Sequence, residues 1–226
     1  MKIRLHLKIF VFIAIFIVTR QIEIYGILML FALFHELGHM LAGILLGFKP
    51  NSLEIMPLGL SIGFESKLEN YNRKIKKGTL LTLKKTIIAA NGPLTNLLFI
   101  IVFLLFPISF LGISRDIVIY ANILIAIFNL IPIYPLDGGR IAKGILHILF
   151  GRKEACRYSY MISNVTISIL TAISSIVILN LKNIAILLIL AYLWYLVISE
   201  NKRYRTKQKI YEKIKNIEKT DKATVS

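Results

Sequence analysis

The sequence predicts an all-α membrane protein with six transmembrane helices and a small β-hairpin or sheet between the second and third. Hydrophobic residues make up 56% of the chain and the mean hydropathy is +0.70, which is higher than in soluble domains. Apolar stretches recur at lengths close to the roughly 20 residues that cross a bilayer. Between the second and third stretches the hydrophobic period changes to two, which is the period of a β-strand.

The six predicted spans lie near residues 5–19, 24–47, 86–106, 116–133, 158–180 and 183–199. The first follows a basic start, as in a signal peptide, but the segment before Arg20 offers no small-residue cleavage site, so we expect an uncleaved span. We therefore expect one membrane domain over residues 1–200, followed by a basic amphipathic cytoplasmic tail over residues 201–226.

Positive charge is distributed unevenly over the predicted loops. The formal net charge is +16, and 25 of the 28 Lys and Arg residues fall in the N-terminus, in the loops 48–85 and 134–157, and in the tail. By the positive-inside rule these segments, and hence both termini, are expected to be cytoplasmic. The basic excess therefore indicates topology and attraction to anionic lipids. No nucleic-acid-binding motif accompanies it, so no nucleic-acid partner is expected.

Residues 58–65 alternate between large apolar and small or polar side chains, and they predict a strand. Residues 53–56 are a second candidate, separated from the first by Pro57, and the two are expected to form a small sheet. Open sheet edges cannot face lipid, so this sheet lies at the membrane interface or beside a cavity. The polar, Lys-rich residues 66–85 are expected to form a cytoplasmic loop.

The second span contains the sequence His35-Glu36-Leu37-Gly38-His39. On a helix the two histidines share one face, as two zinc ligands require, and Glu36 is placed to take a proton from water activated by the metal. The alternative is a pair of buried histidines that hydrogen-bond to neighbouring helices. Polar residues are costly inside a membrane and usually mark a functional site there, so the metal site is the stronger hypothesis.

The third span opens with Gly92-Pro93-Leu94-Thr95-Asn96. Pro93 either occupies the first turn of a helix or breaks a helix that begins near Thr86. Taken alone, Asn96 is expected to cap a helix or to hydrogen-bond to another helix.

The fourth span ends in Asn129-Leu130-Ile131-Pro132-Ile133-Tyr134-Pro135-Leu136-Asp137-Gly138-Gly139-Arg140, which cannot continue a regular helix. A break at membrane depth is permitted only where the backbone is buried in protein or lines a wet cavity. Asp137 is then either the cap of a helix that begins near Arg140 or the third protein ligand of a zinc ion. Because a histidine pair is already present, we favour the ligand hypothesis and expect one zinc per chain.

These three motifs, in this order, resemble those of the site-2 protease family of intramembrane zinc metalloproteases. The resemblance covers roughly residues 5–200 and implies a metalloendopeptidase whose zinc is bound by His35, His39 and Asp137 and whose catalytic acid/base is Glu36. The supporting residues expected near this site are Asn129, Pro135, Gly92, Pro93 and Asn96.

The layout of a short first span, the histidine motif, a strand loop and six spans is similar to the stage IV sporulation protein FB branch of that family, and residues 1–57 look like a clostridial member. This resemblance implies a protease that releases a sporulation sigma factor from its precursor in the mother-cell membrane. The best-known members of the branch carry a CBS domain after the last span. About 26 residues follow Glu200 here, so we expect no CBS domain.

A substrate helix must unwind before its peptide carbonyl can be reached. The strand over residues 58–65 is predicted to bind the unwound segment by strand addition, on the face that Gly59, Ser61 and Gly63 leave nearly bare. Alternative substrates are an anti-sigma factor or a signal-peptide remnant, and membrane regulatory proteins are further expected partners. An alternative of another class is a zinc transporter or a non-catalytic scaffold, although a transporter would distribute its ligands along several spans.

Overall fold

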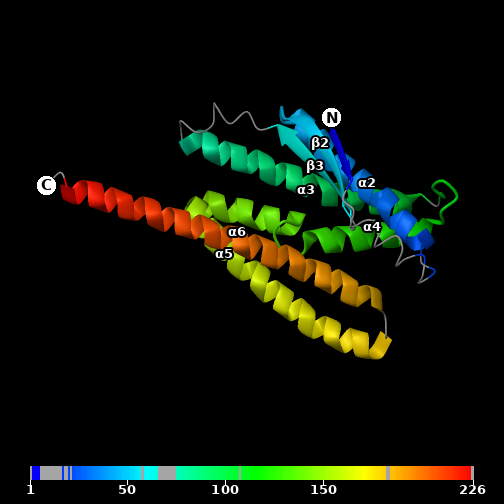
Figure 1. Cartoon of the computed structure of the whole chain (residues 1–226). Helices are drawn as coiled ribbons and strands as arrows, with labels where there is room; N and C mark the ends of the chain where they lie inside the picture. Colours follow the sequence, from blue (N-terminus) through cyan, green and yellow to red (C-terminus); the bar gives the residue numbers. More distant parts are fainter. Residues whose placement is uncertain are drawn as a thin grey trace.

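The computed structural model describes residues 2–5, 17, 20, 22–56, 59–65, 75–106, 108–181 and 184–224, which are mostly helical (Figure 1). The described elements are β1 (Lys2–Leu5), α2 (Ile22–Leu45), β2 (Lys49–Met56), β3 (Gly59–Glu65), α3 (Ile75–Leu105), α4 (Arg115–Leu130), α5 (Asp137–Leu181) and α6 (Ile184–Thr224). A helical fold with a small sheet is thus confirmed. Among the described residues, three segments are long and apolar enough to cross a membrane, namely Ile22–Leu45, Gly78–Leu105 and Asp137–Val177. The count of six spans stays a prediction.

The three apolar segments turn most of their surface outward. In the apolar 18-residue stretch of each segment, only 28%, 28% and 11% of the residues, respectively, are buried inside the protein. Apolar surface of this extent is unfavourable in water, whereas it is the normal surface of a helix in lipid. The fold is therefore that of a membrane protein.

Helix α3 lies against α2, α4 and α5, and α6 packs against α5 (Figure 1). Two clusters of buried apolar side chains stabilise this arrangement. The first joins α2, α3 and α4 through Phe31, Phe103, Val118, Ala121 and Ile125. The second joins the segment before α5 to α5 and α6 through Ile133, Ile167, Leu193 and Val197. The first cluster therefore packs α2 against α3 and α4, and the second packs the segment that leads to Asp137 against α5 and α6.

The sheet has the strand order β1-β2-β3, with β1 parallel to β2 and β2 antiparallel to β3. The predicted hairpin is confirmed, with Ser61 of β3 opposite Glu54 of β2. Strand β1 was missed, and Leu5, where the first span was predicted to begin, belongs to it. Four residues are too few to display a hydrophobic period. The sheet lies along α2, where the ring of Phe64 occupies the space beside Gly43.

Helix α3 begins earlier than predicted, because residues 75–85 are helical rather than part of a cytoplasmic loop. The Nζ atom of Lys84 donates a 3.0 Å hydrogen bond to the carbonyl of Leu46, just beyond the end of α2. A cation is favourable at a helix C-terminus, so this lysine stabilises helix packing. Pro93 neither begins nor breaks a helix, since α3 continues through it, as membrane helices tolerate.

The chain leaves the helical conformation between α4 and α5, but α5 begins at Asp137 rather than near Arg140. Helix α5 is two helices joined at Gly151, whose φ of 80° is readily adopted by glycine. The region 134–157, predicted as a loop around a short helix, is therefore helical from Asp137 onward. Helix α4 has 16 residues and a length of about 24 Å, somewhat less than the roughly 30 Å of a bilayer core.

The predicted first span falls largely outside the described residues. The predicted sixth span is the beginning of α6, which continues as one helix through residue 200, where the tail was expected to begin. The C-terminal part of α6, drawn in red, extends beyond the other helices (Figure 1).

Candidate metal centre

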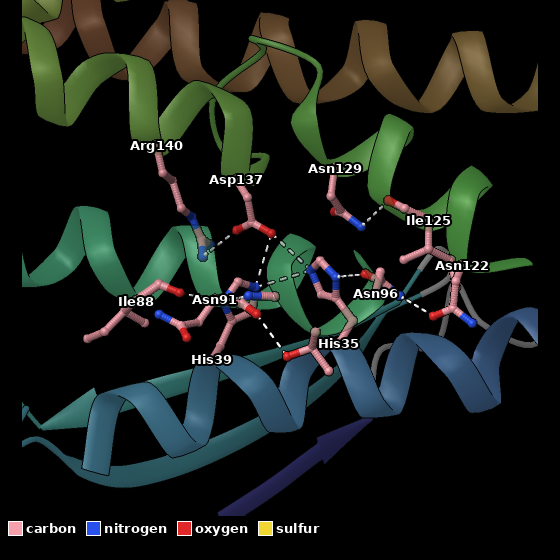
Figure 2. A network of polar contacts seen from close by, with 12 residues as sticks. His35, His39, Ile88, Asn91, Asn96, Asn122, Ile125, Asn129, Asp137 and Arg140 are labelled. Carbon is pink, nitrogen blue, oxygen red and sulfur yellow. Dashed lines mark hydrogen bonds and ion pairs between the residues drawn. The ribbon is translucent and has the colours of Figure 1, made fainter. Parts of the chain in front are cut away.

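Three buried side chains from two helices point toward one another (Figure 2). His35 and His39 lie one turn apart on α2, and Asp137 is the first residue of α5. The Nε2 atoms of both histidines lie 3.0 Å from Oδ2 of Asp137 and 3.2 Å from each other. The structure therefore brings together the three residues that the sequence predicts as metal ligands.

The separation of these atoms fits a zinc ion. Zinc–nitrogen and zinc–oxygen bonds are about 2.0–2.2 Å long, so two ligand atoms of a tetrahedral site lie about 3.3–3.5 Å apart. The observed separations of 3.0–3.2 Å are close to this distance. Three donor atoms directed at one point in a buried setting are stabilised by a cation, and two imidazoles with one carboxylate are a ligand set of catalytic zinc.

The opposite ring nitrogen of His39 is held by the backbone of α3. Nδ1 lies 2.7 Å from the carbonyl oxygen of Ile88 and 3.2 Å from the amide nitrogen of Gly92. The Gly92 amide could donate to Nδ1, but the contact with Ile88 is shorter and a carbonyl can only accept. Nδ1 is therefore assigned the proton and donates a hydrogen bond to Ile88. The Nε2 atom of His39 is then left with its lone pair toward the metal position.

His35 is held by a side chain rather than by backbone. Its Nδ1 donates a 2.5 Å hydrogen bond to Oδ1 of Asn96 on α3, and Nδ2 of Asn96 donates a 2.8 Å bond to Oδ1 of Asn122 on α4. The Nδ2 atom of Asn122 donates to the carbonyl of Val118 at 2.9 Å. Asn122 was missed by sequence analysis. The available signal was a lone amide in an apolar span, seven residues before Asn129.

The second oxygen of Asp137 faces a cation. Its Oδ1 lies 3.6 Å from Nη1 of Arg140, one turn later on α5, while Oδ2 faces the histidines. Arg140 was predicted only as the beginning of a helix. Its placement favours the ionised carboxylate, which is the form that binds a metal.

A side chain at position 92 would enter the space between the two imidazoles. A Cβ atom built on Gly92 would stand against the Nε2 atoms of both His35 and His39. Gly38 is equally constrained, since a Cβ there would meet Thr95 of α3. The Gly92-Pro93-Leu94-Thr95-Asn96 motif thus supplies a bare backbone position beside the ligands and, through Asn96, a hydrogen-bond partner for one of them.

The remaining predicted residues surround this centre without binding at it. Glu36 is partly buried on α2 beside His35. Asn129 lies at the end of α4 and its Nδ2 donates to the carbonyl of Ile125 at 3.0 Å, away from the ligands (Figure 2). Pro135 lies in the non-helical segment that leads to Asp137, and Pro93 is buried in α3, one residue after Gly92.

The residues Gly59, Ser61 and Gly63 lie on β3, at one edge of the described sheet. Strand β3 contacts α2 through Phe64, which packs against Gly43, one helical turn beyond His39. The strand therefore runs beside the helix that carries the histidines.

Comparison with known proteins supports the predicted family. The sequence profile of peptidase family M50 matches residues 114–173, the region that contains Asn122, Asn129 and Asp137. Stage IV sporulation protein FB of Bacillus subtilis is 26% identical over 155 residues, which are 68% of this chain and 49% of that protein. A zinc metalloprotease of Methanocaldococcus jannaschii is 31% identical over 122 residues, which are 52% of this chain and 32% of that protein. The chain thus spans about half and about a third of the length of these relatives.

The architecture also matches a solved structure. The site-2 protease from Methanocaldococcus jannaschii superimposes with a TM-score of 0.61 at 22% identity, over 88% of this chain and 89% of that chain. The fold is therefore that of a site-2 protease. The match to the profile of peptidase family M50 and the homology to stage IV sporulation protein FB agree with the family that the three motifs predict.

The bare backbone at position 92 gives a direct test of the metal position. Gly92→Ala should weaken zinc binding by about tenfold or more, because an outer-shell change already costs 10–100-fold and this methyl group would touch both imidazoles. Gly78→Ala on the same helix is the matched control, since a Cβ there meets nothing within 4 Å. The test is the zinc content of each purified protein, determined by metal analysis. Equal zinc content in both variants would contradict this placement of the metal.

Proposed function

We propose that the protein is an intramembrane zinc metalloendopeptidase that cleaves a membrane-associated protein substrate near the cytoplasmic face, with one zinc per chain. The observation that carries this proposal is the convergence of His35, His39 and Asp137, at separations of 3.0–3.2 Å between their ligand atoms, on a helix where Glu36 follows His35. The match to the profile of peptidase family M50 and a relative named as a zinc metalloprotease support it.

In this proposal zinc supplies a Lewis acid that lowers the pKa of water to about 7 and polarises the scissile carbonyl. Glu36 takes the proton of the attacking water and returns it to the departing amine. Asn129 hydrogen-bonds to the substrate backbone or to the developing oxyanion. One hydrogen of its Nδ2 is donated to Ile125, and the second is available for this role.

The substrate backbone is proposed to pair with β3. This strand lies at the edge of the described sheet and runs beside α2. An unwound substrate segment would satisfy its backbone groups by adding a strand there. Gly59, Ser61 and Gly63 place small side chains on β3, so a second backbone can approach closely.

The proposed topology has six spans and both termini in the cytoplasm of a bacterial cell. Lys202, Arg203, Arg205 and Lys209 are exposed on α6, directly after its apolar first half. Such a basic segment is retained on the cytoplasmic side and is attracted to anionic lipids. The proposed division is a membrane domain over residues 1–200 and a basic tail over residues 201–226, and regulatory membrane proteins are further proposed partners.

The proposed substrate is a sporulation sigma-factor precursor, in the mother-cell membrane of a spore-former. The similarity to stage IV sporulation protein FB supports this choice. Mass spectrometry of candidate substrates co-expressed with the protein tests it. Cleavage of an anti-sigma factor or of a signal-peptide remnant in place of the precursor would support the alternative substrates.

Replacing the proposed acid/base should abolish proteolysis and spare the metal. Glu36→Gln is expected to lower cleavage by on the order of a hundredfold or more, with zinc content unchanged, because the proposed ligands are intact. Glu23→Gln, at the exposed start of the same helix, is the matched control and should cleave normally. Cleavage by Glu36→Gln at the wild-type rate would show that the observed proteolysis does not depend on this site, and it would thereby favour a transporter or scaffold.

Proline substitutions on β3 test the substrate strand. Successive backbone N–H groups point to opposite edges of a strand, so Ser61→Pro and Ile62→Pro each remove a donor from a different edge. Both should impair cleavage while zinc content stays at the wild-type level. One variant removes a donor that the substrate would use, and the other removes a donor that pairs with β2 in the hairpin. Substrate should also crosslink to cysteines at positions 60–64. Normal cleavage by both variants, with no crosslink, would make this strand an inert packing element.

Cysteine labelling tests the topology. In a Cys156→Ser background, a cysteine replacing Arg205 on α6 should react with a membrane-impermeant maleimide only after permeabilisation. A cysteine replacing Asp116, which is exposed at the start of α4, should react in intact cells. Labelling with the opposite pattern would overturn the cytoplasmic placement of the termini.

A further inference from the structure

A continuous chain of hydrogen bonds crosses three helices behind His35 (Figure 2). It runs from His35 on α2 to Asn96 on α3, then to Asn122 and the carbonyl of Val118 on α4, with distances of 2.5, 2.8 and 2.9 Å. Both asparagine side chains are fully buried, with 0% exposure. Buried amides are costly unless their donors and acceptors have partners. The hydrogen bonds of this series therefore offset the cost of burying two amides.

The direction of the chain is set at its far end. The carbonyl of Val118 can only accept, so Asn122 must present Nδ2 to it and Oδ1 to Asn96. Asn96 must then donate through Nδ2 and present Oδ1 to His35. An oxygen acceptor at Nδ1 requires that this nitrogen carry the proton. The Nε2 atom of His35 is therefore left with a lone pair toward Asp137.

The two histidines differ in what fixes their tautomer. His39 donates directly to the backbone carbonyl of Ile88, which has no other orientation. His35 donates to an amide side chain, and an amide can turn either its oxygen or its NH2 group toward the ring. Asn96 alone does not decide between these orientations. Asn122 does, because it offers Asn96 only an acceptor.

We infer that Asn122 is a positioning residue that orients His35 as a zinc ligand by fixing the side-chain amide of Asn96. This inference rests on the proposed zinc site and identifies one residue that supports it from outside the ligand set. Partners that orient a metal-binding histidine typically contribute 10–100-fold to metal affinity. A loss of this size is expected when Asn122 no longer dictates the orientation of Asn96.

Two substitutions of similar size separate orientation from packing. Asn122→Leu removes both polar atoms, so Asn96 is free to turn its NH2 group toward His35 and to favour the tautomer that cannot bind zinc through Nε2. Asn122→Asp keeps an oxygen that accepts from Asn96, whether or not the new carboxyl is protonated. If Asn122 acts by orienting Asn96, Asn122→Leu should weaken zinc binding and Asn122→Asp should not. If Asn122 only fills space in the core, the opposite order is expected, because a carboxyl costs more to bury than a leucine side chain.

The matched control is the amide pair between α5 and α6. Asn201 donates to Oδ1 of Asn164 at 2.9 Å, and Asn164 donates back at 3.3 Å. Asn201→Leu thus removes an interhelical amide contact of the same kind, with no link to a histidine. Zinc affinity is measured by chelator competition on the full-length protein, with thermal unfolding of the metal-free proteins as the check on folding.

The expected result is a 10–100-fold loss of zinc affinity in Asn122→Leu, and affinity within about threefold of wild type in Asn122→Asp and Asn201→Leu. Cobalt substituted for zinc should give the wild-type absorption spectrum in Asn122→Asp and an altered spectrum in Asn122→Leu. Unchanged affinity in Asn122→Leu, a larger loss in Asn122→Asp, or an equal loss in Asn201→Leu would each overturn the inference while leaving the proposed protease intact. Failure of the wild-type protein to bind zinc would overturn the proposed metal site and this inference together.

Discussion

The metal-ligand geometry is set by one contact, in which a single carboxylate oxygen of Asp137 meets the Nε2 atoms of two histidines. The atoms lie 3.0 Å apart although Asp137 follows His35 by 102 residues. The helical repeat of α2 aligns the histidines, and the non-helical segment before α5 brings the carboxylate to them. One cluster of buried side chains packs α2 against α3, a second packs the segment before α5 against α5 and α6, and α5 also contacts α3. The donor atoms therefore meet inside packed protein.

Close approach of backbone is the second requirement of this geometry. Gly92 leaves the space between the two imidazoles empty of side chain, and Gly38 lets α2 approach α3 at Thr95. At the beginning of α5, a Cβ on Gly138 would meet the carbonyl of Leu130 at the end of α4. Each motif glycine beside the ligands therefore corresponds to a place where a methyl group would displace a ligand, a helix or the turn that carries Asp137.

The sequence was sufficient wherever the information was local. The four-residue spacing of His35 and His39 placed both on one helix face, and the alternation over residues 58–65 predicted a strand that the structure forms as β3. Long-range pairing could not be read in this way. Asn122 gains its role from Asn96 on another helix, and Lys84, which was expected in a loop, lies on α3 and reaches the end of α2. Strand β1 is too short to show a period, and it forms only because β2 pairs with it.

X-ray absorption at the zinc K-edge of the purified protein is the most direct test of the central claim, that His35, His39 and Asp137 together bind one catalytic zinc. We expect two imidazoles and carboxylate oxygen as the atoms bound to the metal, at one zinc per chain. Asp137→Ala should lose this oxygen and most of the zinc. Full zinc retention with unchanged metal ligands in Asp137→Ala would contradict this assignment, because the metal would then be held without Asp137.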